Sequence, residues 1–333
     1  MYPDGIKRGK GNPVANGLYL CILLLFPGVV FADTEHTQLR TLSIGKMERT
    51  YRVHVPPSYH PGVPAAVVMA FHGGESDAQR IEKTLRFSAI SDRENLIVVY
   101  PNAVDGHWND GRKSALFAKH DKKVDDVSFV LKMLKALRKE FSIDTTRVFA
   151  VGVSNGGIFV QRLAVEHADL FASIGSVVAS IPEPLKERFR PSARVSAIFI
   201  NRTDDRFVPY AGGEVSFHLL PMLKTLRRPP DRGRVLSTEE SVNLWVQYNR
   251  ATSTRLSARI PDHEPRDGAT AEMFVYSGGD RETFVSLYRV NGGGHTIPGG
   301  STGIPPKHIF GNICTDFDST EAIWLFFKHN ARK

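Results

Sequence analysis

The sequence predicts an α/β fold, in which a mostly parallel central sheet carries helices on both faces. Continuous apolar runs such as "AAVVMAFHGG" at residues 65–74 have the length of strands and end in glycine. Runs of this kind are typical of strands that are covered on both faces. They alternate along the chain with segments of helical periodicity, which is the order expected for repeated strand–helix–strand units.

The expected elements begin with a half-exposed strand at residues 49–56, where apolar and polar residues alternate. Buried strands are expected at residues 65–74, 95–103, 147–152 and 194–201, and a last strand at 282–290. Helices are expected at residues 124–141, 155–167, 237–249 and 318–330. Capping residues mark the starts of three of these helices, namely Asp125, Ser237 with Glu240 as a capping box, and Asp318. We assign Asp125 and Asp126 to capping, because a helix start explains this carboxylate pair without acid–base catalysis.

Residues 1–32 have the pattern of a secretory signal peptide. A basic segment precedes the apolar run "LYLCILLLFPGVVFA", which ends in small residues at Ala32. An uncleaved anchor is the alternative, but the run is short for a membrane span and Pro27 interrupts it. We therefore expect a secreted or periplasmic protein without stable membrane insertion after cleavage.

Residues 33–333 are expected to form a single catalytic domain, because nothing in them resembles a domain linker. Residues 211–281 are the least regular and are the candidate for a cap or a substrate-shaping insertion. The chain has 333 residues, of which 41% are hydrophobic and 23% charged, as in soluble globular proteins. Its net charge of +8 is scattered, so we expect no nucleic-acid partner. We expect a monomer.

The cysteine count restricts the chemistry further. Cys21 lies in the expected signal peptide, so Cys314 alone remains and an internal disulfide is excluded. A cysteine-based zinc cluster is excluded on the same count, and no H-E-x-x-H spacing is present. The sequence therefore predicts neither a metal nor an organic cofactor.

The stretch Gly152-Val153-Ser154-Asn155-Gly156 fits a nucleophile elbow. A G-x-S-x-G pattern arises by chance in roughly one chain of this length in ten, so its context must decide. Here an apolar strand precedes Ser154 and a helix follows it, as an elbow requires. Small residues are needed on both sides of so sharp a turn, and Gly152 and Gly156 provide them. The alternative is a glycine turn with a purely topological role.

A serine hydroxyl needs a base, and that base needs an orienting carboxylate. In this architecture the three follow one another in the order serine, acid, histidine. His295 follows the last strand in the glycine loop "NGGGHTIPGG" and is the expected base. Asp204 and Asp205 follow another buried strand, and position alone does not decide between them.

The stretch "FHGGES" follows an earlier strand and is the expected oxyanion loop. Its backbone near Gly74, with the N–H of Asn155, would stabilise a tetrahedral oxyanion. His72 and Gly73 are expected to contact substrate. Trp108, in the loop "DGHWNDGR", is a further candidate for lining the substrate pocket, with packing as the equally weighted alternative.

These motifs resemble the secreted esterases that include carbohydrate esterase family 1 (feruloyl and acetylxylan esterases) and extracellular poly(3-hydroxybutyrate) depolymerases. The stretches that carry the resemblance are "FHGG", "VVYPNAVDGHWNDGR", "DDVSFV", "IDTTRVFAVGVSNGG", "DDRFVPYAGG", "GGGHTIPGG" and "STEAIWLFF". The resemblance implies the α/β-hydrolase fold, and the family pattern places the acid directly before x-x-V-P-Y, which selects Asp205. Many relatives have disulfides near the active site, and depolymerases usually have a substrate-binding domain. We expect neither in this protein, which favours soluble or oligomeric esters over solid polymer.

The resemblance implies a serine carboxylic-ester hydrolase that acts on small or oligomeric esters derived from polysaccharide or polyester. Two other functions remain open at this stage. A prolyl-oligopeptidase-like peptidase uses the same order of residues, but usually has an N-terminal propeller for which residues 33–64 leave no room. A non-catalytic binding protein of the same fold usually lacks one of the three residues.

Overall fold

The computed structural model describes residues 36–216, 231–300 and 307–332. The expected signal peptide at residues 1–32 lies outside the described residues. Within the described ranges, no helix combines the length and the apolar character needed to cross a membrane.

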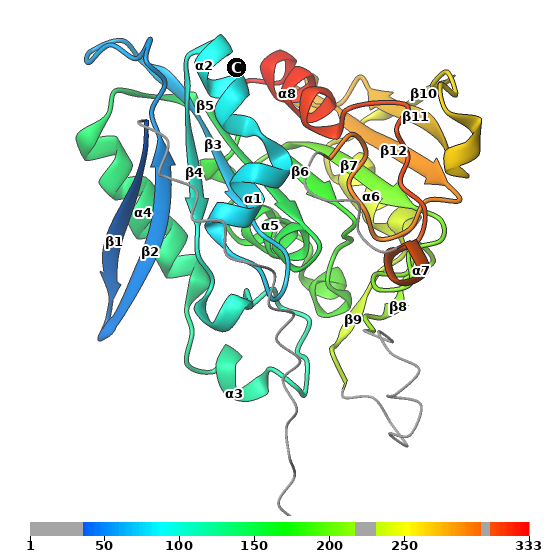
Figure 1. Ribbon diagram of the computed structural model, residues 1–333, viewed down its shortest axis with the longest axis horizontal. Helices are drawn as coiled ribbons and strands as arrows, with labels where there is room; N and C mark the ends of the chain where they lie inside the picture. Colours follow the sequence, from blue (N-terminus) through cyan, green and yellow to red (C-terminus); the bar gives the residue numbers. More distant parts are fainter. Residues whose placement is uncertain (1–35, 217–230, 301–306, 333) are drawn as a thin grey trace, which may run out of the picture. The chain divides into compact units, whose positions relative to one another are not determined.

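Ten strands of the described residues form one sheet in the order β1-β2-β4-β3-β5-β6-β7-β12-β11-β10 (Figure 1). They are β1 (Thr37–Ile44), β2 (Met47–His54), β3 (Ala65–Phe71), β4 (Leu96–Pro101), β5 (Ile143–Val153), β6 (Ser173–Val177), β7 (Ser196–Arg202), β10 (Thr252–Arg259), β11 (Thr270–Ser277) and β12 (Val285–Asn291). The central strands from β4 to β12 in this order run parallel to one another. Antiparallel strands extend the sheet at both edges. The predicted mostly parallel sheet is therefore confirmed.

Helices cover both faces of this sheet, as the sequence predicts (Figure 1). They are α1 (Ala78–Leu85), α2 (Phe87–Glu94), α3 (Ala118–Asp121), α4 (Asp126–Glu140), α5 (Asn155–Glu166), α6 (Thr238–Tyr248), α7 (Lys307–Phe310) and α8 (Ser319–His329). Alternate residues of β3 and β4 point to opposite faces, because side chains alternate along a strand. One set packs with α4, α5 and α6, and the other with α1, α2 and α8.

Several elements were not predicted from the sequence, and β6 is the most central of them. Three of its five residues, Ser173, Gly175 and Ser176, are small, which weakens the apolar signal of a buried strand. A Cβ atom on Gly175 would lie 3.2 Å from Val151 Cγ2 and 3.4 Å from Ile323 Cγ2. Close packing against β5 and α8 therefore favours a small residue at this position.

The range 211–281 contributes α6, β10 and β11 to the main layers. A separate two-stranded sheet pairs β8 (Gly213–Glu214) with β9 (Arg234–Val235). Val235 of β9 and the adjacent Val215 pack against Ile158 of α5. Residues 217–230 lie outside the described residues.

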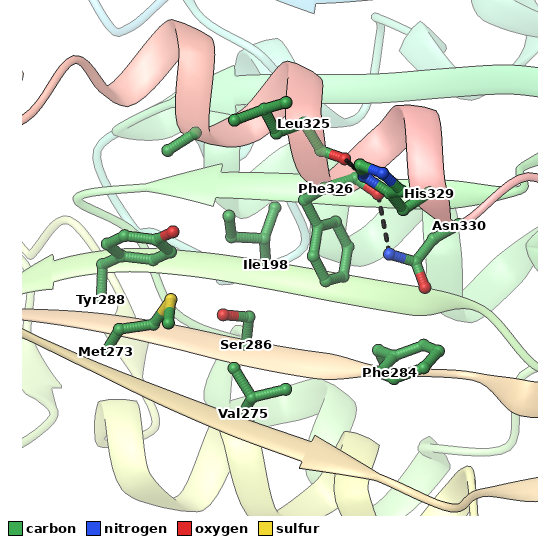
Figure 2. Close-up of a pocket in the computed structure, with 11 residues that line it drawn as sticks. Ile198, Met273, Val275, Phe284, Ser286, Tyr288, Leu325, Phe326, His329 and Asn330 are labelled. Atoms are coloured by element: carbon green, nitrogen blue, oxygen red, sulfur yellow. Dashed lines mark hydrogen bonds between the residues drawn. The ribbon is translucent and has the colours of Figure 1, made fainter. Parts of the chain in front are cut away.

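A cavity of about 310 Å³ lies between α8 and the strands β7, β11 and β12 (Figure 2). Its lining is mostly apolar and includes Ile198, Met273 and Phe326, with the Ser286 and Tyr288 side chains among them (Figure 2). None of the predicted site residues lines this cavity. The predicted residues instead follow the carboxyl ends of parallel strands, where functional residues of open α/β sheets gather.

Candidate active site

Ser154 lies at a sharp turn between β5 and α5. Its backbone has φ +54° and ψ −123°, a conformation that L-residues rarely adopt. A Cβ atom on Gly152 would lie 2.2 Å from the carbonyl oxygen of Gly156, and one on Gly156 would lie 2.3 Å from that of His72. Both glycines are therefore sterically required, which confirms the geometric reasoning about the elbow.

Three side chains from three strand ends meet at this turn. His295 Nε2 lies 3.1 Å from Ser154 Oγ, and His295 Nδ1 lies 2.7 Å from Asp205 Oδ2. Because the carboxylate can only accept, Nδ1 donates to Asp205 and the neutral ring leaves Nε2 free to accept from the serine hydroxyl. The imidazole side chain is 11% exposed and the Asp205 side chain 2% exposed, so water has little access to this pair.

The turn that follows Asp205 fixes its carboxylate. Asp205 Oδ1 accepts hydrogen bonds from the backbone N–H groups of Phe207 at 2.8 Å and Val208 at 3.0 Å. The neighbouring Asp204 is exposed, and its carboxylate accepts only from the Thr203 hydroxyl among the bonds of the described residues. The structure therefore brings Asp205 to His295 and leaves Asp204 at the surface.

Main-chain hydrogen bonds connect the loop that contains His295 to the neighbouring loops. The N–H of Asp204 donates to the carbonyl oxygen of Gly293 at 3.1 Å, and Gly294 N–H donates to that of Asn312 at 3.0 Å. The Phe207 ring lies 5.0 Å from the His295 ring, measured between centroids. These contacts hold the histidine loop beside the acid loop and restrict the imidazole.

The expected oxyanion loop lies next to the elbow. A Cβ atom on Gly73 would lie 3.5 Å from Ser154 Cβ, and one on Gly74 would lie 3.9 Å from Asn155 Cβ. Within the described ranges, the N–H groups of Gly74 and Asn155 have no hydrogen-bond partner. Asn155 is also the first residue of α5, where the helix dipole favours negative charge.

Both His72 and Trp108 are fully buried, which contradicts the expectation that His72 contacts substrate and, of the two alternatives for Trp108, supports packing. His72 Nδ1 donates to the carbonyl oxygen of Gly73 at 2.7 Å, and its Nε2 accepts from Ala103 N–H at 3.0 Å. Burial lowers the pKa of His72 and keeps the ring neutral for this role. Trp108 packs in the core against Phe71 and Phe159.

The side chain of Asn155 has a role that the sequence did not indicate. Its Oδ1 accepts from Trp108 N–H at 2.8 Å, and its Nδ2 donates to Trp108 O at 3.0 Å and to Asp110 Oδ2 at 2.6 Å. Asp110 is also paired with Arg112 Nε at 2.8 Å. Asn155, the residue after Ser154, thereby anchors the loop at residues 105–112 next to the elbow.

The assignment of two aspartates to helix capping holds for one of them. Asp125 caps α4 by accepting from Ser128 N–H at 2.9 Å. Asp126 is not a cap: its buried carboxylate accepts from Arg49 Nη2 at 2.6 Å and from Asn109 N–H at 2.8 Å. Periodicity marks the helix start, but only the fold reveals the arginine that pairs with the second carboxylate.

A buried cation lies close to the acid and was not anticipated either. Arg202 ends β7 with 1% of its surface exposed, and within the described residues none of its guanidinium nitrogens has a hydrogen-bond partner. Burial lowers the pKa of Arg202 to about 10, and the nearby Asp205 carboxylate opposes that shift by favouring the charged form. A charged residue at the end of an apolar run gives no signal of burial in the sequence.

Sequence comparison identifies a family for a little more than half of the chain. The model of a family described as "Putative esterase" matches residues 43–215. The chain is 28% identical over 271 residues to "Putative esterase NocK" of Nocardia uniformis subsp. tsuyamanensis. This alignment covers 80% of this chain and 75% of that protein.

Two further similarities agree with this match. The chain is 27% identical over 269 residues to "Bifunctional acetylxylan esterase/xylanase XynS20E" of Neocallimastix patriciarum, covering 75% of this chain but 36% of that longer protein. The solved structure "Acetyl xylan esterase from Aspergillus awamori" superposes with a TM-score of 0.54 at 12% identity, over 78% of this chain and 95% of that one. The structural similarity identifies the α/β-hydrolase fold.

Proposed function

The chain belongs to the esterase family, and from this premise we propose that it is a serine carboxylic-ester hydrolase that works through an acyl-enzyme on Ser154. The observation that carries the proposal is the continuous hydrogen-bonded chain from Ser154 Oγ through His295 to Asp205, with separations of 3.1 and 2.7 Å. A nucleophile, a base and an orienting carboxylate in this order are what activation of a serine hydroxyl requires.

In the proposed first step, His295 Nε2 takes the proton of Ser154 as Oγ attacks the ester carbonyl. Asp205 holds the proton of Nδ1 in place and stabilises the imidazolium that forms. The N–H groups of Asn155 and Gly74 donate to the developing oxyanion, and loss of one such donor typically lowers kcat by about 100- to 1000-fold. The imidazolium then protonates the leaving alcohol.

In the second step, His295 removes a proton from water, which attacks the acyl-enzyme, and Ser154 is released with its proton restored. The whole reaction needs only these side chains and backbone donors, so the proposal includes no metal or organic cofactor in catalysis. The low exposure of the His295 and Asp205 side chains supports the proposal, because electrostatic interactions are stronger where water is excluded.

The proposed substrates are small or oligomeric esters. The acetylxylan esterase activity in the name of one relative supports acetyl esters of polysaccharides as the first class to test. Feruloyl esters and 3-hydroxybutyrate oligomers are the other two classes that the sequence motifs suggest. We also propose that the range 211–281 shapes substrate access through its described residues 211–216 and 231–235, since Val215 and Val235 pack on Ile158 in the helix that follows Ser154.

The proposed location is outside the cytoplasm, after removal of residues 1–32. This proposal is supported by the basic and apolar segments of the N-terminal sequence. N-terminal sequencing of the protein from its source should find Asp33 as the first residue. Recovery of the full-length chain would refute cleavage.

The direct test of the proposed function compares wild-type protein with Ser154→Ala in hydrolysis of p-nitrophenyl acetate and butyrate. We expect activity to fall to background while the melting temperature and the circular dichroism spectrum stay unchanged. Labelling by a fluorophosphonate probe should be lost in the same variant. Full activity in Ser154→Ala would overturn the mechanism, and peptide hydrolysis without ester hydrolysis would favour a peptidase instead.

A further inference from the structure

Two histidines and an aspartate come together in the segment that follows β4. His107 lies directly after the short helical turn η1 (Val104–Gly106), while His120 and Asp121 end α3. One nitrogen of each ring and one carboxylate oxygen lie within 4.8 Å of one another. Two imidazoles and one carboxylate form a donor set that suits zinc and related divalent transition-metal ions.

The distances between these donor atoms fit a tetrahedral metal site. His107 Nε2 lies 3.5 Å from Asp121 Oδ1, and His120 Nδ1 lies 3.1 Å from the same oxygen. Zinc binds nitrogen and oxygen at about 2.0–2.2 Å, so two ligands of a tetrahedral site lie about 3.3–3.6 Å apart. The donor atoms are therefore already near the separations that a bound ion would impose.

The hydrogen bonding of His120 orients its ring for binding a metal ion through Nδ1. Its Nε2 lies 3.1 Å from the carbonyl oxygen of Val104, which can only accept, so Nε2 carries the hydrogen. Nδ1 is then the ring nitrogen available to a metal ion, and it lies 3.1 Å from Asp121 Oδ1. A metal-bound histidine commonly donates its other N–H to a backbone carbonyl in this way.

Neighbouring contacts hold the two segments that supply the donors. The His107 ring stacks on Phe117 with 3.6 Å between centroids. Asn109 Nδ2 donates to the main-chain oxygen of Asp121 at 2.9 Å, which joins the loop to the end of α3. The donor side chains are 7%, 12% and 19% exposed for His107, His120 and Asp121 respectively. The cluster is thus ordered by its surroundings but still open to an ion from solvent.

A second cluster, Asp267, Cys314 and Asp316, is a weaker candidate. Its carboxylates already accept from the backbone N–H groups of His263 and Thr315. Burial raises the pKa of the Cys314 thiol to about 12, so the group is not a thiolate at neutral pH. This cluster therefore serves as the control for the first one.

We propose that His107, His120 and Asp121 bind one zinc ion, with water completing the coordination, and that the ion fastens α3 to η1. This site is separate from the proposed catalytic residues and does not depend on the esterase mechanism. It also differs from the cysteine sites that the sequence excludes, because it needs no thiolate. The exposed residues Lys119, Lys122 and Lys123 flank His120 and Asp121 in the sequence, and their charge limits the affinity of the site for a cation.

The test is a titration of the full-length, tag-free and metal-stripped protein with Zn²⁺ in a calorimeter, repeated with Co²⁺ in an absorption spectrometer. We expect one Zn²⁺ per chain, a visible absorption band typical of tetrahedral Co²⁺, and a rise of a few degrees in melting temperature with Zn²⁺. In His107→Ala we expect at least a tenfold loss of affinity and no rise in melting temperature. Asp121→Asn, which keeps the shape of the side chain, should weaken binding in the same way.

Two variants control for binding elsewhere in the molecule. Cys314→Ser removes the thiol of the second cluster and His295→Ala removes the imidazole beside Ser154, so both should bind Zn²⁺ as wild type does. The proposal is overturned if the wild-type protein binds no Zn²⁺, or if His107→Ala and Asp121→Asn bind it unchanged. Loss of binding in Cys314→Ser or His295→Ala alone would also overturn it.

Discussion

Replacement of Asp205 by asparagine tests the proposed mechanism with the smallest change in shape. The two N–H groups of Phe207 and Val208 need the oxygen at the Oδ1 position as acceptor. If the amide turned its NH₂ group towards them, two buried donors would lose their partner, at a cost of about 1–3 kcal/mol each. The amide nitrogen must therefore occupy the position of Oδ2 and face His295.

That orientation forces the wrong form of the imidazole. The amide NH₂ donates, so His295 Nδ1 must accept and its hydrogen moves to Nε2. Nε2 then has no lone pair for the proton of Ser154, although it lies 3.1 Å from Oγ. We expect kcat/KM to fall by about 1000- to 10,000-fold, which corresponds to about 4–5.5 kcal/mol in the activation free energy.

The assay is hydrolysis of p-nitrophenyl acetate at pH 8, with the melting temperature measured in parallel to verify folding. Asp204→Asn is the matched control, because its carboxylate is exposed and accepts only from Thr203 among the bonds of the described residues. The control should stay within about twofold of wild type, as expected for a surface change. The reasoning is refuted if Asp205→Asn keeps a tenth of the activity, or if the two variants lose activity equally.

Three further outcomes follow from the packing of the chain. Trp108→Ala should destabilise the fold by about 3–5 kcal/mol in urea unfolding, while KM changes little. A large change in KM without loss of stability would show instead that Trp108 contacts substrate. Gly156→Ala should abolish activity or folding, because its Cβ would lie 2.3 Å from a carbonyl oxygen; an active variant of wild-type melting temperature would contradict this. Burial raises the folded-state pKa of Cys314 from 9.0 to about 12, so its thiol should resist a thiol reagent until the protein unfolds. The stability linked to this thiol is complete below pH 9 and is lost between pH 9 and 12, a loss that Cys314→Ser should not show in unfolding measured across that range.

Much of the fold could be predicted because its signals are local. β3 is apolar throughout, and the buried stretches 148–153 of β5 and 197–200 of β7 are apolar as well, which is the composition that buried parallel strands require. The α8 cap at Asp318 and the Ser237–Glu240 capping box also appear as predicted. β6 could not be predicted, because its small residue Gly175 is favoured by contacts with Val151 and Ile323, which are distant in the sequence.

The candidate site likewise has a part that local sequence predicts and a part that depends on the fold. The strand before Ser154, the helix after it and the glycines around it are adjacent in sequence, so the elbow can be recognised there. Local sequence does not reveal which loop side chains turn inward, as Trp108 and His72 do, because core packing decides that.

The sequence by itself determined the central strands apart from β6, the longer helices α4, α5, α6 and α8, the glycine-flanked Ser154, and the histidines and aspartates that could serve it. These features depend on neighbours along the chain, whose periodicity and backbone requirements are visible in the letters. The position of the two aspartates left the acid open, and the resemblance to a known family selected Asp205. Only the tertiary structure showed the contact of Asp205 with His295 and the hydrogen bonds from the Asn155 side chain to the Trp108 loop. It also brought His107 to His120 and Asp121. Such pairings depend on distances across the fold, which are fixed when the sheet and its helices pack together.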